Sequence, residues 1–267
     1  MKPIEEQTVL VTGATDGLGR ALALDLAGRG AEVWVHGRDD SRGDQTLKEI
    51  RAEHPDARVH WVRADLASLD EVRGLAAAMA DIPLDVLVSN AGIGGEGPRQ
   101  ESADGFELHF AVNYLAGYLL TRSLLPTLTA SAAGGGARIV MVSSLGQQAL
   151  DFDDVMLTRG YSGMRAYCQS KLAQIMFTFD LADELEGTGV TANALHPATY
   201  MPTKMVAHPI STIAEGEEAT ARLVADPDLD GVTGRFFDGL REARADDQAY
   251  DAEARRRLRE LSDRLVG

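Results

Sequence analysis

The sequence predicts an α/β fold in which a doubly wound parallel sheet carries helices on both faces. Short apolar runs alternate with longer stretches of helical periodicity along nearly the whole chain. The first run, residues 9–11, breaks into a turn with glycines at 13, 17 and 19 and restarts as a helix. No repeat and no linker-like stretch divides the 267 residues. Because strands that alternate with helices form one parallel sheet, we expect residues 1–267 to be a single domain.

Composition and charge argue against several classes of protein. The formal net charge is −15, with 41 acidic against 26 basic residues, which argues against nucleic acid or an anionic membrane as a partner. No apolar run reaches the ~18 residues that span a bilayer. Residues 1–7 are too short and too acidic for a signal peptide, so a cytoplasmic location is expected. Cys168 is the single cysteine and the histidines lack a metal-ligand spacing, so we expect no disulfide and no metal.

Hydrophobic periodicity and turn residues divide the chain into regular elements. The predicted strands are residues 7–11, 32–36, 58–62, 84–89, 138–142, 188–195 and 234–237. The predicted helices are residues 18–30, 41–53, 69–80, 103–131, 164–185, 210–224 and 248–265. Ser41 is the expected N-cap of the second helix. The three arginines at 255–257 in the last helix are expected to face solvent.

The glycine turn has the spacing of a dinucleotide site. Gly13 permits the tight turn after the first strand. Gly17 and Gly19 would let a pyrophosphate approach backbone N–H groups at the positive end of the next helix. A purely structural turn is the alternative, but the strand-turn-helix setting favours binding. The expected cofactor contacts in this turn are Gly13, Thr15, Asp16, Gly17, Leu18 and Gly19.

The motif Thr-Gly-x-x-x-Gly-x-Gly is one residue longer than the commonest Rossmann fingerprint and resembles that of the short-chain dehydrogenase/reductase family. The resemblance covers nearly the whole chain and implies a Rossmann-type, NAD(P)-binding domain. Three features look most like the family's retinol-dehydrogenase-like and WW-domain-oxidoreductase-like branch. They are the long connection after Ser144, the Tyr-Cys-Gln-Ser-Lys motif at 167–171 and the Phe-Phe-Asp-Gly motif at 236–239.

The end of the second strand bears on the choice between NAD and NADP. Rossmann-type proteins that prefer NAD usually have an acidic residue there, which accepts hydrogen bonds from the adenosine ribose. Here Gly37 and Arg38 leave room and a positive charge for a 2′-phosphate, so NADP(H) is favoured. Alternatively, Arg38 stacks on adenine or pairs with Asp39 or Asp40. Asp16 argues against NADP, because family members that use it often have a basic residue near that position.

The resemblance implies further contacts to the cofactor. Asp65 would accept from the adenine amine, with Leu66 beside it; alternatively, Asp65 or Ser68 caps the helix that follows. The Asn-Ala-Gly motif would let the cofactor cross the strand ends, and residues after the sixth strand would touch the nicotinamide and the phosphates. These contacts are assigned to Asn90, Ala91, Gly92, Pro197, Thr199 and Thr203. The family's usual glycine after the proline is replaced by alanine here, and Thr203 comes one residue later than usual.

Polar residues lie where a parallel sheet places its active site. The fifth strand ends at Ser144, and the ends of parallel strands face the cofactor crevice. Tyr167 and Lys171 lie four residues apart, and therefore on one face of a helix. Tyr161 and Arg165 have the same spacing. An arginine that never loses its proton cannot replace lysine in a proton relay, so Tyr167 and Lys171 are favoured.

The resembling family uses a serine, a tyrosine and a lysine in this pattern, together with an asparagine on an earlier helix. The matching residues are Asn113, Ser144, Tyr167 and Lys171, with Ser143 as the alternative serine. Ser144 would bond the substrate oxygen, and Tyr167 would give it a proton as hydride arrives. A phenol has a pKa of ~10, so Lys171 is expected to lower the pKa of Tyr167 and to hold the ribose. Asn113 would hold a helix distortion and link the pair to solvent.

These residues predict an oxidoreductase, such as a carbonyl reductase, that moves a hydride between the nicotinamide and a carbonyl or alcohol carbon. An epimerase or dehydratase that retains its nicotinamide, or a non-catalytic regulatory protein, is the alternative. Segments 145–163 and 197–225 are expected on the substrate side, the first as a wall or lid. Their apolar residues suggest an apolar substrate or ordinary packing: Phe152, Met156, Leu157, Tyr200 and Met205.

Self-association is also expected. The helices at 103–131 and 164–185 carry more apolar surface than one sheet face needs, and the resembling family commonly pairs these helices. We therefore expect a homodimer or homotetramer, which the charge of −15 per chain should weaken at low salt. His196 is expected to be structural rather than catalytic.

Overall fold

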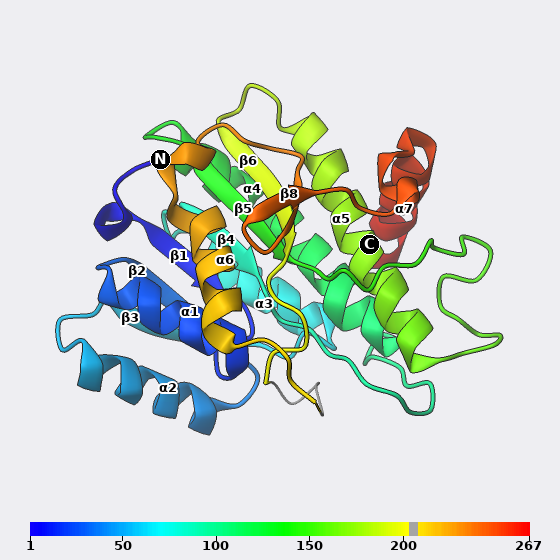
Figure 1. The fold of residues 1–267 in the computed structure, drawn as a ribbon, viewed down its shortest axis with the longest axis horizontal. Helices are drawn as coiled ribbons and strands as arrows, with labels where there is room; N and C mark the ends of the chain where they lie inside the picture. Colours follow the sequence, from blue (N-terminus) through cyan, green and yellow to red (C-terminus); the bar gives the residue numbers. More distant parts are fainter. Residues whose placement is uncertain (203–207) are drawn as a thin grey trace.

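An eight-stranded sheet forms the centre of the computed structural model, which describes residues 1–202 and 208–267 (Figure 1). The strands are β1 (Thr8–Val11), β2 (Glu32–Gly37), β3 (Val59–Arg63), β4 (Val86–Ser89), β5 (Ala137–Val142), β6 (Val190–His196), β7 (Phe236–Asp238) and β8 (Arg241–Ala243). All neighbouring strands are parallel except β7 and β8. The predicted α/β fold with one doubly wound sheet is confirmed, and β8 adds an antiparallel edge strand that we did not predict.

The strand order is β3-β2-β1-β4-β5-β6-β7-β8, so the chain begins in the middle of the sheet and winds outward in both directions. The direction of winding changes between β1 and β4, which are hydrogen-bonded neighbours. In open α/β sheets, ligands bind in the crevice beyond the carboxyl ends of the strands at such a point. The turn after β1 and the residues that follow β4 and β5 therefore meet at one edge of the sheet.

Helices cover both faces of the sheet (Figure 1). One face carries α1 (Gly17–Gly28), α2 (Asp40–Glu53) and α6 (Ile213–Ala225). The other carries α3 (Leu69–Met79), α4 (Ala116–Ala132), α5 (Gly163–Glu184) and α7 (Ala252–Val266). Each set of helices buries its own apolar cluster against the strands, and this burial is the main source of the fold's stability.

Most predicted boundaries lie within about three residues of the observed ones. The main exception is the helix predicted from residue 103, which begins instead with a π-helical turn, η2 (Phe110–Leu115), ahead of α4. Before it, Ser102 Oγ accepts backbone N–H groups of residues 104 and 106, and Glu107 accepts those of residues 109 and 110. Side chains thus replace helical hydrogen bonds there. The N-cap of α2 is Asp39 rather than Ser41, because the Asp39 carboxylate accepts the Arg42 N–H.

The last predicted helix divides into a short turn, η4 (Asp247–Tyr250), and α7. The expectation that all three of its arginines face solvent was wrong. The Arg255 guanidinium pairs with Asp183 of α5 at 2.8 Å, and that of Arg257 lies 4.5 Å from the ring centroid of Phe152. Only Arg256 pairs within α7 itself. Two of the arginines therefore attach α7 to the body of the protein.

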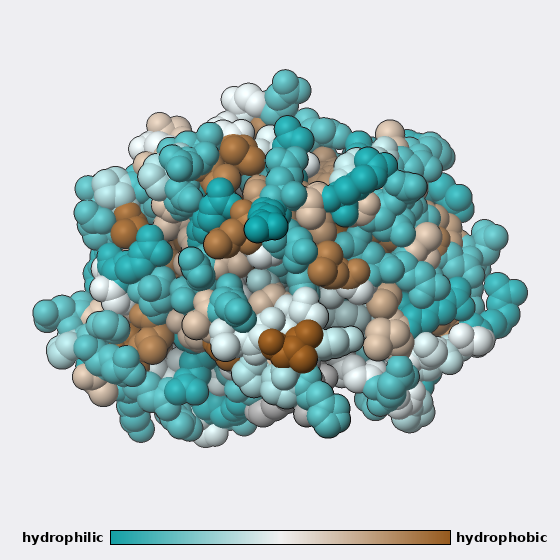
Figure 2. All heavy atoms as spheres, viewed as in Figure 1, coloured by the Kyte–Doolittle hydropathy of each residue, from teal (hydrophilic) through white to brown (hydrophobic). Residues whose placement is uncertain are grey.

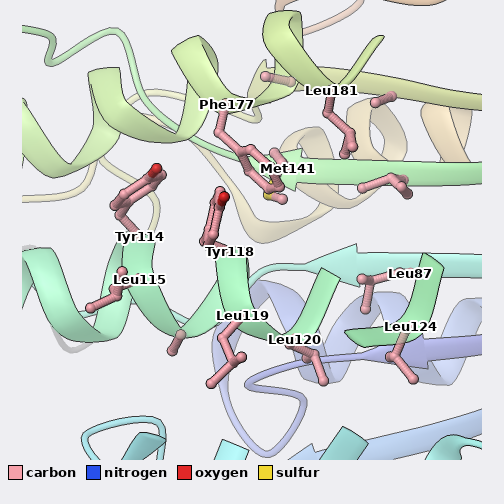
Figure 3. Packing of buried hydrophobic residues seen from close by; sticks show 14 of the residues in the cluster. Leu87, Tyr114, Leu115, Tyr118, Leu119, Leu120, Leu124, Met141, Phe177 and Leu181 are labelled. Carbon is pink, nitrogen blue, oxygen red and sulfur yellow. The ribbon is translucent and has the colours of Figure 1, made fainter. Parts of the chain in front are cut away.

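Helix α7 closes the apolar face formed by α4 and α5. Tyr118 of α4 packs on Phe177 of α5, with ring centroids 4.7 Å apart (Figure 3). Above them, the Tyr114 hydroxyl bonds Ser262 at 2.7 Å and the Tyr118 hydroxyl bonds Asp263 at 2.5 Å. Leu258 of α7 is 1% exposed. Helix α7 thus covers part of the apolar surface that suggested self-association, and self-association stays a prediction.

The outer surface agrees with the acidic, polar composition. The face that carries α1 and α6 is mostly hydrophilic, with small and separate apolar patches (Figure 2). Among the described residues, no helix is long and apolar enough to cross a membrane.

Candidate active site

The glycine turn lies between β1 and α1 and packs against the end of β4. Gly13 has φ +66°, and a Cβ on it would lie 2.8 Å from Cα of Ala91. A Cβ on Gly19 would lie 2.5 Å from Nδ2 of Asn90 and from the Gly13 carbonyl oxygen. Gly13 and Gly19 therefore allow the turn and α1 to approach β4 closely. Gly17, with φ +49°, begins α1 and leaves the turn open at the helix N-terminus.

Two polar side chains inside the turn hold it together. Thr12 Oγ1 donates to the Val88 carbonyl and accepts the N–H groups of Asn90 and Ala91. The Asn90 amide donates to the carbonyls of Thr12 at 2.8 Å and Gly13 at 3.3 Å. Asn90, predicted as a cofactor contact, thus positions the turn through its side chain. Thr12 was not singled out, although it stands directly before the first glycine of the motif.

His36 at the end of β2 is a further positioning residue that sequence reasoning missed. Its Nδ1 accepts the Gly13 N–H at 3.2 Å, and its Nε2 lies 3.2 Å from the Ala64 carbonyl. Nε2 must therefore carry the proton. Burial lowers the pKa of His36 to about 4, so the imidazole is neutral at physiological pH. In the sequence, the signal that could have identified His36 is a histidine at the end of the strand that follows the glycine turn.

The charged residues near the expected 2′-phosphate position make contacts that the sequence alone did not predict. Asp16 caps α1, since one carboxylate oxygen accepts the Gly17 N–H at 3.0 Å, while the other pairs with Arg42 at 3.0 Å. Asp39 bonds Ser41 and the Arg42 backbone, so it is not engaged with Arg38. Within the described ranges 1–202 and 208–267, Arg38 is exposed and no ion pair involves it. Arg42, which we did not predict, lies next to the carboxylate of Asp16.

Asp65 lies in the loop after β3, and its contact with adenine stays a prediction. Its carboxylate accepts the Ala67 N–H at 3.0 Å, and Ser68 rather than Asp65 caps α3. Leu66 is buried in the core next to α3, so only its backbone can face a cofactor. The helix-capping alternative for Asp65 is therefore wrong, while that for Ser68 is confirmed.

Ser144 and Tyr167 converge beside Gly146. A Cβ on Gly146 would lie 3.4 Å from Ser144 Oγ and 3.5 Å from Tyr167 Cε1. Burial raises the pKa of Tyr167 above its ordinary value, and the contact with the Ser144 side chain acts in the opposite direction. Ser144 Oγ accepts the Gly146 N–H at 3.0 Å. The alternative serine, Ser143, donates instead to the backbone carbonyl of Lys171 at 2.7 Å and so ties β5 to α5.

Lys171 lies beneath this pair and is buried. Its ammonium donates to the Val142 carbonyl at 3.0 Å and lies 5.7 Å from the centroid of the Tyr167 ring. Burial lowers the pKa of Lys171 to about 8. We expected Lys171 to lower the pKa of Tyr167. Burial is the largest influence on the pKa of Tyr167 in this structure, and the effect of Lys171 on that pKa when a cofactor is bound stays a prediction.

Asn113 lies in the π-helical turn η2 and joins two other parts of the site. Its Oδ1 accepts the Ile93 N–H at 2.7 Å, and its Nδ2 donates to the Ile93 carbonyl at 3.0 Å and to Ser170 Oγ at 2.9 Å. A Cβ on Gly92 would lie 3.3 Å from Asn113 Oδ1 and 3.4 Å from Lys171 Nζ. The predicted helix distortion at Asn113 is present, and Gly92 leaves room beside the lysine.

The segment after β6 lies next to these residues. His196 is buried and its Nε2 lies 2.9 Å from Thr199 Oγ1. Burial lowers the pKa of His196, and its contact with Thr199 holds the loop that begins at Pro197. Thr203 and Met205 fall outside the described residues. No group of three His, Cys, Asp or Glu side chains that could hold a metal occurs in the described part of the chain.

Residues 145–163, the segment expected to act as a wall or lid and called the wall below, are held by hydrogen bonds and by packing in the interior. Tyr161, the alternative acid, points its hydroxyl at Glu107 at 3.4 Å. Arg99 Nε donates to the Met156 carbonyl at 3.0 Å, and Leu157 is 1% exposed. Leu157 thus packs in the interior, whereas Phe152 stacks under Arg257 of α7.

Residues 7–212 match the family described as short chain dehydrogenase. The chain is 38% identical to retinol dehydrogenase 13 of Mus musculus, over 99% of this chain and 85% of that protein. It is 36% identical to retinol dehydrogenase 14 of Homo sapiens, over 98% and 86% of the two chains. It is also 38% identical to polyprenol dehydrogenase of Mus musculus, over 100% and 86%.

Solved structures agree with this result. An uncharacterized protein from Mycobacterium paratuberculosis superposes with a TM-score of 0.79 at 30% identity, over 98% of this chain and 93% of that one. A short chain dehydrogenase from Shigella flexneri, solved with NADP, superposes with a TM-score of 0.72 at 28% identity, over 88% and 97%.

Proposed function

Because this chain belongs to the short-chain dehydrogenase family, we propose that it is an NADP(H)-dependent oxidoreductase that acts on the carbonyl or alcohol carbon of an apolar substrate. One observation carries the proposal. Ser144, Tyr167 and Lys171 converge at the carboxyl end of β5, beside the glycine turn that follows β1. The family consists of oxidoreductases, and this arrangement supplies an oxygen-binding hydroxyl, a proton donor and a buried ammonium.

The described residues fit a dinucleotide. Gly13 and Gly17 adopt positive φ, so the turn presents backbone at the N-terminus of α1, where the Asp16 carboxylate accepts the Gly17 N–H. The carboxylate of Asp65 keeps one oxygen available for the adenine amine, since the Ala67 N–H bonds the other. Among residues 1–202 and 208–267, the Lys171 ammonium bonds a single backbone carbonyl, and it would hold the ribose hydroxyls. A bound nicotinamide would supply or accept the hydride.

The charges near Arg38 support NADP(H) rather than NAD(H). Asp16 argued against NADP, but its carboxylate is occupied by the Gly17 N–H and by the Arg42 guanidinium. The two arginines and the aspartate together leave one net positive charge. Arg38 is exposed at the end of β2 and would meet a 2′-phosphate first, with Arg42 as a second partner.

The side chains of the site would carry out the proton transfer. Ser144 Oγ would donate a hydrogen bond to the substrate oxygen and hold it beside Tyr167. The raised pKa of Tyr167 keeps its phenol protonated at neutral pH, which is the state needed to give a proton to a carbonyl oxygen. Asn113 would keep Gly92 and the Tyr167–Ser170 turn of α5 in register through Ile93 and Ser170. This arrangement favours reduction of a carbonyl over oxidation of an alcohol.

The substrate class follows from the surroundings of Ser144. Leu145 comes directly after it and is 47% exposed, and Met164 lies one turn before Tyr167 on α5 and is 57% exposed. Exposed apolar side chains so near Ser144 and Tyr167 in the chain suit a lipophilic aldehyde or ketone. Relatives named retinol and polyprenol dehydrogenases are consistent with such a substrate.

Incubating the protein with NADPH or NADH and a panel of aldehydes and ketones of increasing chain length tests the proposal. We expect NADPH to be consumed with apolar carbonyls and Tyr167→Phe to abolish its consumption. Tight NADPH binding without consumption across the panel would favour the non-catalytic regulatory alternative. Conversion of a substrate with no net change in NADPH would favour an epimerase.

A further inference from the structure

The segment that follows Ser144 is bonded to a part of the chain almost a hundred residues further on. Between β5 and α5 the structure has no helix or strand, so the backbone groups of this segment cannot pair within a regular element. Gln169 of α5 donates to the Ala149 carbonyl at 2.9 Å, and two further glutamine side chains connect the segment to residues 246–248. Gln147 contacts Asp246, and Gln248 contacts Leu150, at sequence separations of 99 and 98.

The first glutamine links the backbone of Ser144 to the C-terminal segment. Gln147 Nε2 donates to the Ser144 carbonyl at 2.9 Å, and its Oε1 accepts the Asp246 N–H at 2.7 Å. The amide group thus uses both of its ends. Because the peptide of Ser144 is held from this side, a shift of residue 246 would be transmitted to Ser144.

The second glutamine imitates a neighbouring strand. Gln248 Oε1 accepts the Leu150 N–H at 2.6 Å, and its Nε2 donates to the Leu150 carbonyl at 3.2 Å. The Leu150 side chain is 5% exposed, which anchors the same residue in the core. Asp246 also accepts the Gln248 N–H at 3.0 Å, so both glutamine contacts belong to one connected network.

We propose that Gln147 and Gln248 are positioning residues for the substrate, because they fix the Ser144 peptide and the wall at 145–152 through residues 246–248. The inference rests on the proposed function for its catalytic consequence. Neither glutamine contacts a residue of the glycine turn. They therefore affect binding of the carbonyl substrate and not binding of NADPH. None of the four hydrogen bonds involves Tyr167 or Lys171, so the pH profile of turnover is also unchanged.

The variants Gln147→Met and Gln248→Met remove the amide groups and keep the side-chain length. For each, we expect KM for the carbonyl substrate to rise about tenfold, the scale of one or two lost hydrogen bonds, with kcat within about threefold. Kd for NADPH should stay within about twofold. Gln248→Glu keeps the acceptor for the Leu150 N–H and should recover part of the loss. Asp247→Asn is the matched control, because that neighbouring side chain is exposed and pairs only with the exposed Arg244.

Hydrogen–deuterium exchange provides a readout that does not depend on turnover. In Gln248→Met, the Leu150 amide should exchange at least about tenfold faster, while Asp247→Asn leaves it unchanged. Unchanged exchange at Leu150 would disprove the contact. Faster exchange with an unchanged KM would disprove the positioning role. If the wild type consumed no NADPH with any carbonyl, the proposed function would fail, and exchange at Leu150 would still decide whether the glutamines hold the wall.

Discussion

The proposed preference for NADPH over NADH depends on three charged residues, which are Asp16 at the start of α1, Arg38 after β2 and Arg42 in the first turn of α2. The structure gives each a different weight. Arg38 is exposed and holds no ion pair in the described part of the chain. A charge-assisted hydrogen bond from Arg38 to a 2′-phosphate is worth ~1.5–3 kcal/mol, or roughly 10- to 150-fold in affinity. Asp16 opposes this effect, but its carboxylate is paired with Arg42 at 3.0 Å.

The loss of NADPH affinity caused by Asp16 has an upper limit. The side chains of Asp16 and Arg42 are 46% and 40% exposed, so the pair contributes about 0–1 kcal/mol and opens readily to admit a phosphate. This offset is at most about fivefold. We therefore expect NADPH to bind about tenfold more tightly than NADH. Arg38→Ala should erase most of the difference, and Asp16→Asn should enlarge it by up to about fivefold.

Fluorescence titration of each variant with NADPH and NADH at fixed ionic strength measures both effects. Affinity for NADH should change little in all variants, since NADH lacks the 2′-phosphate. Arg29→Ala is the control for a general loss of positive charge, because Arg29 follows α1 at its opposite end and pairs with Asp25 on the surface. Raising the salt concentration should narrow the gap, because exposed charges are screened. Tighter binding of NADH by the wild type would refute this account of the three charges.

Four further outcomes are expected. Tyr167→Phe should lose at least ~100-fold in kcat while binding NADPH normally, whereas Tyr161→Phe should stay near wild type; the reverse pattern would identify Tyr161 as the acid. Since burial lowers the pKa of Lys171 to about 8, kcat/KM should fall about tenfold per pH unit above that value, and Lys171→Arg, though slower, should lack this decline. His36 has a pKa of about 4 when folded, against 6.5 when unfolded, so its neutral form stabilises the fold fully above pH 6.5. Roughly 3 kcal/mol of that stability is lost as the pH falls toward 4. In thermal melts, the melting temperature of His36→Gln should therefore fall less than that of the wild type over this pH interval. Sedimentation at micromolar concentration should show association that strengthens with salt, and a monomer at both low and high salt would contradict that expectation.

The sequence predicts the helices and strands of this fold well, because the spacing of its apolar residues changes clearly from strand to helix. It predicts the convergence of Ser144, Tyr167 and Lys171 because a strand end and one helix face restrict where these side chains can lie. The long helix from residue 103 was placed too early. Its first residues include Phe106 and Leu108, but the Asp104-Gly105 pair is a turn signal that the prediction overlooked. Gly105 adopts φ +81° there, in a turn held by the hydrogen bonds of Ser102 and Glu107.

Contacts between distant residues could not be predicted from one sequence. His36 and Arg42 act on the glycine turn across 23 and 26 residues or more, and neither belongs to a recognised motif. Gln147 and Gln248 belong to no recognised motif either. In the sequence they look like ordinary polar surface residues, and only the fold shows that residues 246–248 lie against the wall. The pKa of Tyr167 also depends on burial, which spacing along a helix does not report.

The position of α7 has a consequence for biosynthesis. The aromatic residues Tyr114, Tyr118 and Phe177 are covered on one side by residues 252–266, which leave the ribosome more than seventy positions after Phe177. Until then, a nascent chain with its sheet largely formed would expose that aromatic surface to other chains. Such a late, long-range closure slows folding and favours aggregation of the incomplete chain. The protein should therefore depend on chaperones during synthesis more than its compact final state would imply.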